Sequence, residues 1–153
     1  MSALYFRGKL TYARHFGRGS HAVLVITPGF GLVPPEWPLT PERMSRMKGI
    51  DIDVESRAYA EPLRAQSREV AASLPPNETV VLLGSIATGK YVDILQPIFG
   101  ERLRFPAAFA GLGDMARGGL MLRAVREERE LEYVSLDAPR HRPAGASGRM
   151  PPL

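Results

Sequence analysis

The segment TVVLLG, residues 79–84, constrains the fold of this chain most strongly. It is a continuous apolar run rich in β-branched residues, and a run of this kind is typical of a strand buried on both faces. A second run, AVLVIT at residues 22–27, is followed at once by Pro28 and Gly29, which predict a tight loop. The sequence therefore predicts at least two buried strands, each leading into a glycine-bearing loop.

Helix signals follow the predicted strand at residues 22–27. Thr40 stands before Pro41 and Glu42, and this order predicts an N-cap and a short helix that ends near Lys48. Residues 55–74 are also helix-forming, but a proline inside a helix removes a hydrogen bond. We therefore expect Pro62 to break this helix, with a second start close to it.

The second half of the chain repeats the pattern. Apolar residues at helical spacing over residues 91–99 predict an amphipathic helix, which Pro97 should end about one turn early. Residues 102–106 suit a short strand with Leu103 and Phe105 inward. Asp114 could cap a further helix, and residues 131–136 alternate as an edge strand does.

Strands that alternate with helices predict βαβ crossovers, since parallel strands need such connections. We expect a Rossmann-like, three-layer αβα fold with a short, mainly parallel sheet of about four strands. Residues 1–137 should form one domain, and residues 138–153 a basic tail rich in proline and glycine. The loops after Thr27, Gly84 and Phe105 should then share one edge of the sheet, where such folds bind ligands.

Composition excludes several classes of function. The 153 residues include no cysteine, which removes thiolate chemistry, disulfides and sulfur-ligated metals. The three histidines lack the spacing of a metal site, so no metal and no cofactor is predicted. No apolar run reaches the roughly 18 residues of a membrane span. Arg7 and Lys9 lie where a secretory signal needs apolar residues, so we expect a cytoplasmic protein without membrane contact.

The net charge of +4 is unevenly distributed. Residues 1–21 carry four basic residues and residues 138–153 carry three, and neither segment contains an acid. The rest of the chain is slightly acidic. The basic ends could contact nucleic acid, or they could simply be solvated.

The sequence GSIATGK, residues 84–90, matches most of a phosphate-binding loop that follows a buried strand. Backbone N–H groups and Lys90 would hold the anion. Tyr91 stands where such a loop needs a magnesium-binding hydroxyl, which favours anion binding without hydrolysis. The alternative is a plain turn with Tyr91 in the core. The candidate ligand-binding residues of the whole chain are Gly29, Gly31, Gly84, Ser85, Thr88, Gly89, Lys90, Tyr91, Asp114 and Arg117.

A second glycine-rich segment, residues 111–119, surrounds Asp114 and Arg117. Glycine allows close approach to a ligand or to a neighbouring element, so both interpretations stay open here. Arg117 could bind a phosphate, and Asp114 could bind a base edge or act as an N-cap. A carboxylate pair for acid–base catalysis could come from Glu36, Asp93 and Asp114, which leaves both binding and catalysis open.

Three stretches carry a family resemblance, namely VLVITPGFGLVPPE, LLGSIATGKYVDILQP and FAGLGDMARGGLMLR. They resemble, in order, an uncharacterised group of small bacterial α/β domains, which is similar to the uracil-DNA-glycosylase-like domain of archaeosine synthase. The resemblance implies a pocket around Gly29, Gly31, Lys90, Tyr91, Asp114 and Arg117. It does not imply glycosylase activity, since the first loop has no acid before Glu36 and the late His141 lies in the tail.

Three functions follow as hypotheses. The first is binding of a nucleotide, nucleobase or other phosphate-bearing ligand at the carboxyl ends of the strands. The second is a nucleic-acid-binding or modification accessory protein that uses the basic ends. The third is a protein-interaction module without catalysis, with Trp37 and its proline-rich loop, residues 27–38, as the contact surface.

Overall fold

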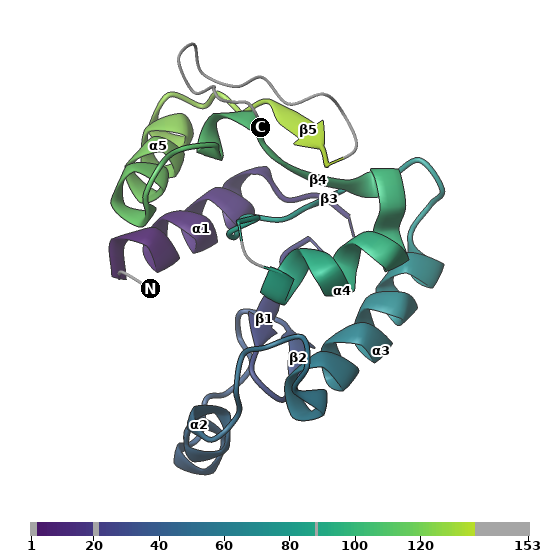
Figure 1. The fold of residues 1–153 in the computed structure, drawn as a ribbon. Helices are drawn as coiled ribbons and strands as arrows, with labels where there is room; N and C mark the ends of the chain where they lie inside the picture. Colours follow the sequence, from purple (N-terminus) through teal and green to yellow (C-terminus); the bar gives the residue numbers. More distant parts are fainter. Residues whose placement is uncertain (1–2, 20–21, 88, 137–153) are drawn as a thin grey trace.

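The chain is a mixed α/β protein (Figure 1). The computed structural model describes residues 3–19, 22–87 and 89–136, and these contain five α-helices and two small sheets, of two and three strands. The predicted tail, residues 138–153, lies outside the described residues, as does Thr88. In the described part of the chain, no helix is long and apolar enough to cross a membrane.

The larger sheet has the order β3-β4-β5, with β3 at Val80–Val81, β4 at Leu103–Pro106 and β5 at Tyr133–Ser135. The β3–β4 pair is parallel and the β4–β5 pair is antiparallel. Leu103 and Phe105 point inward, with 1% and 2% of their surfaces exposed, which confirms the alternation predicted for residues 102–106. The predicted last strand is also confirmed at the edge of the sheet.

The predicted single sheet of about four mainly parallel strands is not observed. β1 (Val25–Thr27) pairs antiparallel with β2 (Gly31–Val33) in a separate hairpin. The reason lies in the turn, where Gly29 and Gly31 adopt φ values of 91° and 66° that favour glycine, and these reverse the chain. The loop after Thr27 therefore leads into β2, and not to the sheet edge shared by the ends of β3 and β4.

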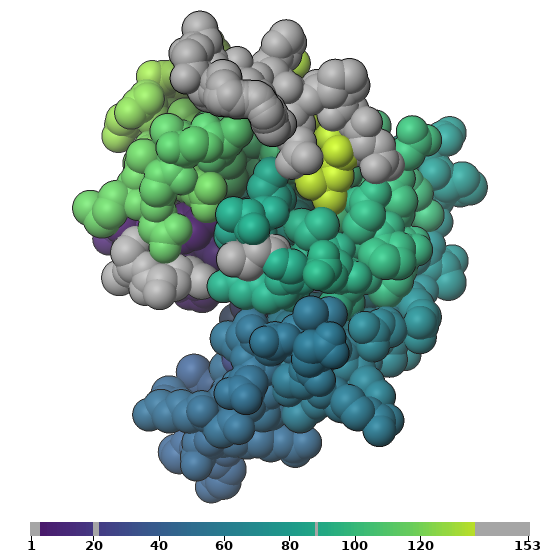
Figure 2. All heavy atoms as spheres, viewed as in Figure 1, coloured from purple at the N-terminus to yellow at the C-terminus, as the bar shows by residue number. Residues whose placement is uncertain are grey.

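Thr40 caps α2 (Pro41–Lys48) as predicted, since its Oγ1 accepts a hydrogen bond of 3.2 Å from the backbone N–H of Arg43. None of the helix residues is buried. Figure 2 shows that this part of the chain, in blue, protrudes from the rest of the molecule.

The break predicted at Pro62 does not occur, because α3 runs without interruption over Arg57–Ser73. Pro62 lies in the second turn, where the bond that it removes would have ended on the carbonyl of Ala58. Ala58 is exposed, so water can hydrate its carbonyl. The helix then ends before Pro75, as expected.

The early end predicted at Pro97 is also wrong. α4 spans Gly89–Phe99 and includes Pro97. Both Pro97 and Asp93, whose carbonyl loses its helical partner, are exposed, so the lost bond again falls on the solvent side. The buried face of α4 holds Ile94, Leu95 and Phe99, as the apolar spacing predicted.

α1 (Ala3–Phe16) was not predicted, and it packs along α5 (Asp114–Arg126) (Figure 1). The two helices form a core with Phe109 that is separate from the core around α3, α4 and β4. Asp114 is the first residue of α5, and Gly113 takes the N-cap position. The expected side-chain cap by Asp114 is therefore absent, which leaves its carboxylate for other contacts.

Candidate anion-binding site

The candidate site lies at the carboxyl end of β3. Because β3 and β4 are parallel, the chain leaves both strands at the same edge of the sheet. The segment after β3 leads into the first turn of α4, and the segment after β4 leads into the first turn of α5. The amino ends of two helices, which carry partial positive charge, thus follow the same edge.

Lys9 of α1 is the most informative side chain of the site. Its ammonium lies 4.3 Å from the centroid of the Tyr5 ring. Burial lowers the pKa of Lys9, and the positive charges of Lys90 and Arg117 lower it further, whereas the carboxylate of Asp114 opposes them. The charges of Lys90, Arg117 and Asp114 therefore all act on Lys9. We call Lys9, Lys90 and Arg117, with Tyr5, Tyr91 and Asp114, the cationic cluster.

The two tyrosines connect the cationic cluster to residues 83 and 84, just after β3. The Tyr5 hydroxyl donates a hydrogen bond of 3.3 Å to the carbonyl of Leu83. Burial raises the pKa of Tyr5, while hydrogen bonding and the positive charge of Arg117 act against this rise. Tyr91 packs over Gly84, where a Cβ would lie 3.1 Å from its ring. Burial also raises the pKa of Tyr91, so both hydroxyls are neutral at physiological pH.

The backbone of Lys90 is fixed by α3. The Tyr59 hydroxyl donates a hydrogen bond of 2.7 Å to the Lys90 carbonyl. The Lys90 ammonium lies 5.1 Å from the centroid of the Tyr91 ring. The first turn of α4 is thereby held while the charged end of Lys90 stays available.

Arg117 is held by a backbone group and not by an acid. Its Nε and Nη2 donate to the carbonyl of Phe109, at 3.4 and 3.3 Å. Within the described residues, none of the three cations forms an ion pair with a carboxylate. Asp114 compensates only part of their charge, so the cationic cluster carries a positive excess that suits a phosphate or carboxylate ligand.

The structure brings together Lys90, Tyr91, Asp114 and Arg117, which the sequence identified in two separate segments. Gly84 takes part by allowing the close approach of Tyr91.

The remaining residues of the 84–90 loop have local contacts. The Ser85 hydroxyl accepts a hydrogen bond of 3.2 Å from the Ala87 N–H. Gly89 begins α4 with the carboxylate of Asp93 directly beside it, where any Cβ would overlap that carboxylate. Thr88 falls outside the described residues.

Gly29 and Gly31 serve the hairpin. A Cβ at Gly29 would overlap Ile50, and one at Gly31 would lie 2.5 Å from Oε1 of Gln66 in α3. Glu36 forms an exposed ion pair of 3.8 Å with Arg14. Of the three candidate catalytic carboxylates, Asp114 is the member whose charge acts on the cationic cluster.

Sequence reasoning missed Tyr5 and Lys9 because it assigned no element to the first turns of the chain. A signal was present. Tyr5, Tyr12 and Phe16 are spaced by seven and four residues, which places them on one face of a helix.

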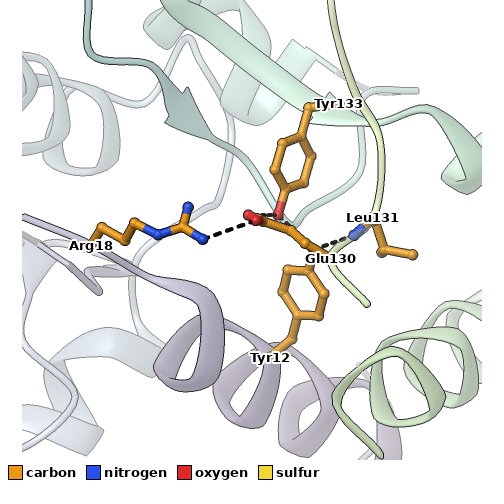
Figure 3. A network of polar contacts seen from close by, with 5 residues as sticks. All are labelled: Tyr12, Arg18, Glu130, Leu131 and Tyr133. Carbon is orange, nitrogen blue, oxygen red and sulfur yellow. Dashed lines mark hydrogen bonds and ion pairs between the residues drawn. The ribbon is translucent and has the colours of Figure 1, made fainter. Parts of the chain in front are cut away.

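A second polar network joins α1 to the segment before β5 (Figure 3). The Leu131 N–H donates to the Tyr12 hydroxyl over 2.8 Å, and the Tyr12 and Tyr133 hydroxyls are 2.5 Å apart. Tyr133 donates to Glu130 over 2.8 Å, and Arg18 pairs with the same carboxylate at 3.2 Å. The donors and acceptors satisfy one another, so this network has a structural role.

No group of three or more potential metal-binding side chains gathers anywhere in the described residues. Comparison with known proteins gives no match: no family model matches the chain, and no curated protein or solved structure matches it.

Proposed function

We propose that this protein binds a phosphate-bearing ligand, such as a nucleotide, at the cationic cluster. The observation that carries the proposal is that Lys9 lies against Tyr5, whose hydroxyl contacts the Leu83 carbonyl just after β3, and that the charges of Lys90 and Arg117 act on Lys9. These cations come from α1, α4 and α5. Three cations from separate helices, accompanied by one carboxylate, favour a ligand with negative charge over a neutral one.

The chemistry favours binding over hydrolysis. Tyr91 stands at the position where a nucleotide-hydrolysing loop has a Ser or Thr whose hydroxyl holds magnesium. Asp114 is the single carboxylate of the cationic cluster, whereas acid–base catalysis by carboxylates uses a pair. The half-buried ring of Tyr91 offers a surface for a nucleobase.

The resemblance to the uracil-DNA-glycosylase-like domain stays a prediction. Four of its six implied positions, Lys90, Tyr91, Asp114 and Arg117, belong to the cationic cluster, which is consistent with a shared ligand position.

A second candidate function is a protein interaction through the protruding segment around α2. Trp37 packs against Phe30, with ring centroids 5.0 Å apart, and Arg43 lies 4.3 Å above it. The exposed apolar side chains of this region are instead Leu39 and Met44, at 53% and 42% exposure. They are the better candidates for a partner-facing patch.

Nucleic-acid binding through the amino-terminal cations has less support. Arg14 and Arg18 form ion pairs with Glu36 and Glu130. These residues are engaged within the chain, which lowers their availability for a phosphate backbone.

Thermal unfolding with inorganic pyrophosphate, mononucleotides and short oligonucleotides tests the proposal. A ligand at 100 times its Kd adds about 2.7 kcal/mol of stability, which raises Tm by roughly 5 to 10 °C for a domain of this size. We expect a shift that disappears in Lys90→Ala and Arg117→Ala. Lys48→Ala on α2 and Arg123→Ala on the exposed side of α5 are the matched controls. Equal shifts in all four variants would contradict the proposed site.

A further inference from the structure

A cavity of about 670 Å³ begins at the cationic cluster, where Lys9, Gly84 and Tyr91 contribute to its lining. It extends between α1, residues 22–26 and β3. Its volume lies within the range of about 300 to 1,000 Å³ that small-molecule sites occupy. An anion bound at the cationic cluster would therefore lie at one end of a much larger space.

The walls of this cavity are mainly apolar side chains. α1 contributes Leu10 and Phe16, the strand segments contribute Val25 and Val81, and α3 contributes Leu74. The lining also includes eight polar side chains, those of Lys9, Tyr12, Arg18, Glu78, Thr79, Tyr91, Glu130 and Tyr133. A wholly polar ligand such as a free sugar phosphate would leave these walls without a partner, because apolar surface is stabilised by apolar contacts.

The two ends differ in charge. At the end away from the cationic cluster, Arg18, Glu130 and Tyr133 line the cavity and satisfy one another through the network of Figure 3. At the other end, Lys9 has no carboxylate in ion-pair contact among the described residues. An anionic head group is thus favoured at the Lys9 end, with the apolar part of the ligand directed into the cavity.

We propose that the cavity holds the apolar chain of an amphipathic anion, with its phosphate or carboxylate head group bound by Lys9, Lys90 and Arg117. This inference rests on the proposed function, since the head group occupies the same cationic cluster. It narrows the ligand class from phosphate-bearing molecules in general to those with a hydrocarbon chain.

Calorimetric titration of the full chain with inorganic phosphate and with ethyl, hexyl and decyl phosphate, below their micellar concentrations, tests the inference. Affinity should rise by up to about fourfold for each methylene group that is buried, as expected from the transfer free energy of that group. Hexanoate and decanoate should show the same dependence if the head group can also be a carboxylate. Decyltrimethylammonium should bind much more weakly than decyl phosphate.

Ala13→Phe places a ring in the cavity, because Ala13 lies in its lining. It should remove the dependence on chain length and retain the response to inorganic phosphate. Ala22→Leu fills a different part of the lining and serves if the first variant does not fold. Ala65→Phe on the exposed side of α3 is the control and should behave as the wild type.

Three results would overturn the inference. If inorganic phosphate binds and affinity does not change with chain length, the cavity proposal fails and the proposed function stands. If the ammonium compound binds as tightly as decyl phosphate, the head-group assignment fails. If no phosphate compound binds, the proposed function fails, and if neither carboxylate binds, the inference fails with it.

Discussion

Gly8 of α1 and Gly118 of α5 bring their helices into backbone contact. A Cβ at Gly8 would lie 2.9 Å from the Gly118 carbonyl oxygen, and a Cβ at Gly118 would lie 3.0 Å from the carbonyl oxygen of Leu4. Both distances are shorter than ordinary carbon–oxygen contacts. This close crossing brings Lys9, the neighbour of Gly8, within electrostatic range of Arg117, the neighbour of Gly118.

Gly8→Ala and Gly118→Ala should therefore destabilise the protein. Overpacking typically costs about 1 to 3 kcal/mol, which outweighs the helix propensity of roughly 1 kcal/mol gained on replacing glycine. Chemical denaturation should report this loss. Both variants should also weaken anion binding, because Lys9 and Arg117 would move apart.

Gly119→Ala is the matched control for this pair. A Cβ at Gly119 meets nothing within 4 Å, although the residue lies on the same helix. This substitution should stabilise the protein by about 0.5 to 1 kcal/mol. If Gly8→Ala and Gly119→Ala change stability by the same amount, the backbone contact between α1 and α5 is not as close as described.

Tyr12→Phe should cost more stability than Glu130→Gln. Tyr12 is 2% exposed and accepts the hydrogen bond of the Leu131 N–H, so its loss leaves a donor unsatisfied at about 1 to 3 kcal/mol. The Glu130 carboxylate pairs with the exposed Arg18, and such pairs contribute about 0 to 1 kcal/mol. Urea unfolding of the two variants measures the difference, and the reverse order would contradict the structural role of this network.

Glu128 follows α5 with a φ of 52°, in the left-handed region that favours glycine. Glu128→Gly should therefore stabilise the protein by about 0.5 to 1 kcal/mol. The neighbouring Glu127 has a φ of −88°, so Glu127→Gly should destabilise it. Thermal unfolding distinguishes the two, and equal effects would show that residue 128 does not adopt this conformation.

The chain has five tyrosines, and burial is the main cause that raises the pKa of each in the folded state. The unfolded chain ionises its tyrosines near pH 10. Their contribution to stability is therefore complete below pH 10 and decreases as pH rises toward the higher folded values. Lys9 acts in the opposite sense, because its lowered pKa makes stability rise with pH up to about 10.5, but it is one group against five.

Denaturant midpoints should accordingly fall above pH 10, and phenolate absorbance should appear together with the loss of helical circular dichroism. Ionisation of all five tyrosines near pH 10 with the helices intact would contradict their burial.

Local chemistry made several elements predictable. Thr40 followed by Pro41 determines the start of α2, and the alternation of Leu103 and Phe105 determines the inward face of β4. The proline breaks were wrong because a lost hydrogen bond costs little where the freed carbonyl faces water, which propensity alone does not report. α1 was missed because the helical spacing of Tyr5, Tyr12 and Phe16 was not interpreted as the buried face of a helix.

The candidate site was predictable in part. Lys90 and Arg117 were identified because each lies in a glycine-rich segment after a predicted strand. Lys9 could not be placed beside them, since that requires the crossing of α1 and α5. The hairpin of Gly29 and Gly31 was assigned to the site because its antiparallel turn was not recognised.

The central claim is that Lys9, Lys90 and Arg117 form one anion-binding site. Equilibrium titration of the wild type, Lys90→Ala/Arg117→Ala and the control Lys48→Ala/Arg123→Ala with pyrophosphate at low salt tests it most directly. We predict saturable binding to the wild type and the control, and a loss of at least tenfold in affinity in the Lys90→Ala/Arg117→Ala variant, since each charged hydrogen bond contributes about 1.5 to 3 kcal/mol. Equal affinity in all three proteins, or no binding to the wild type, would contradict the claim.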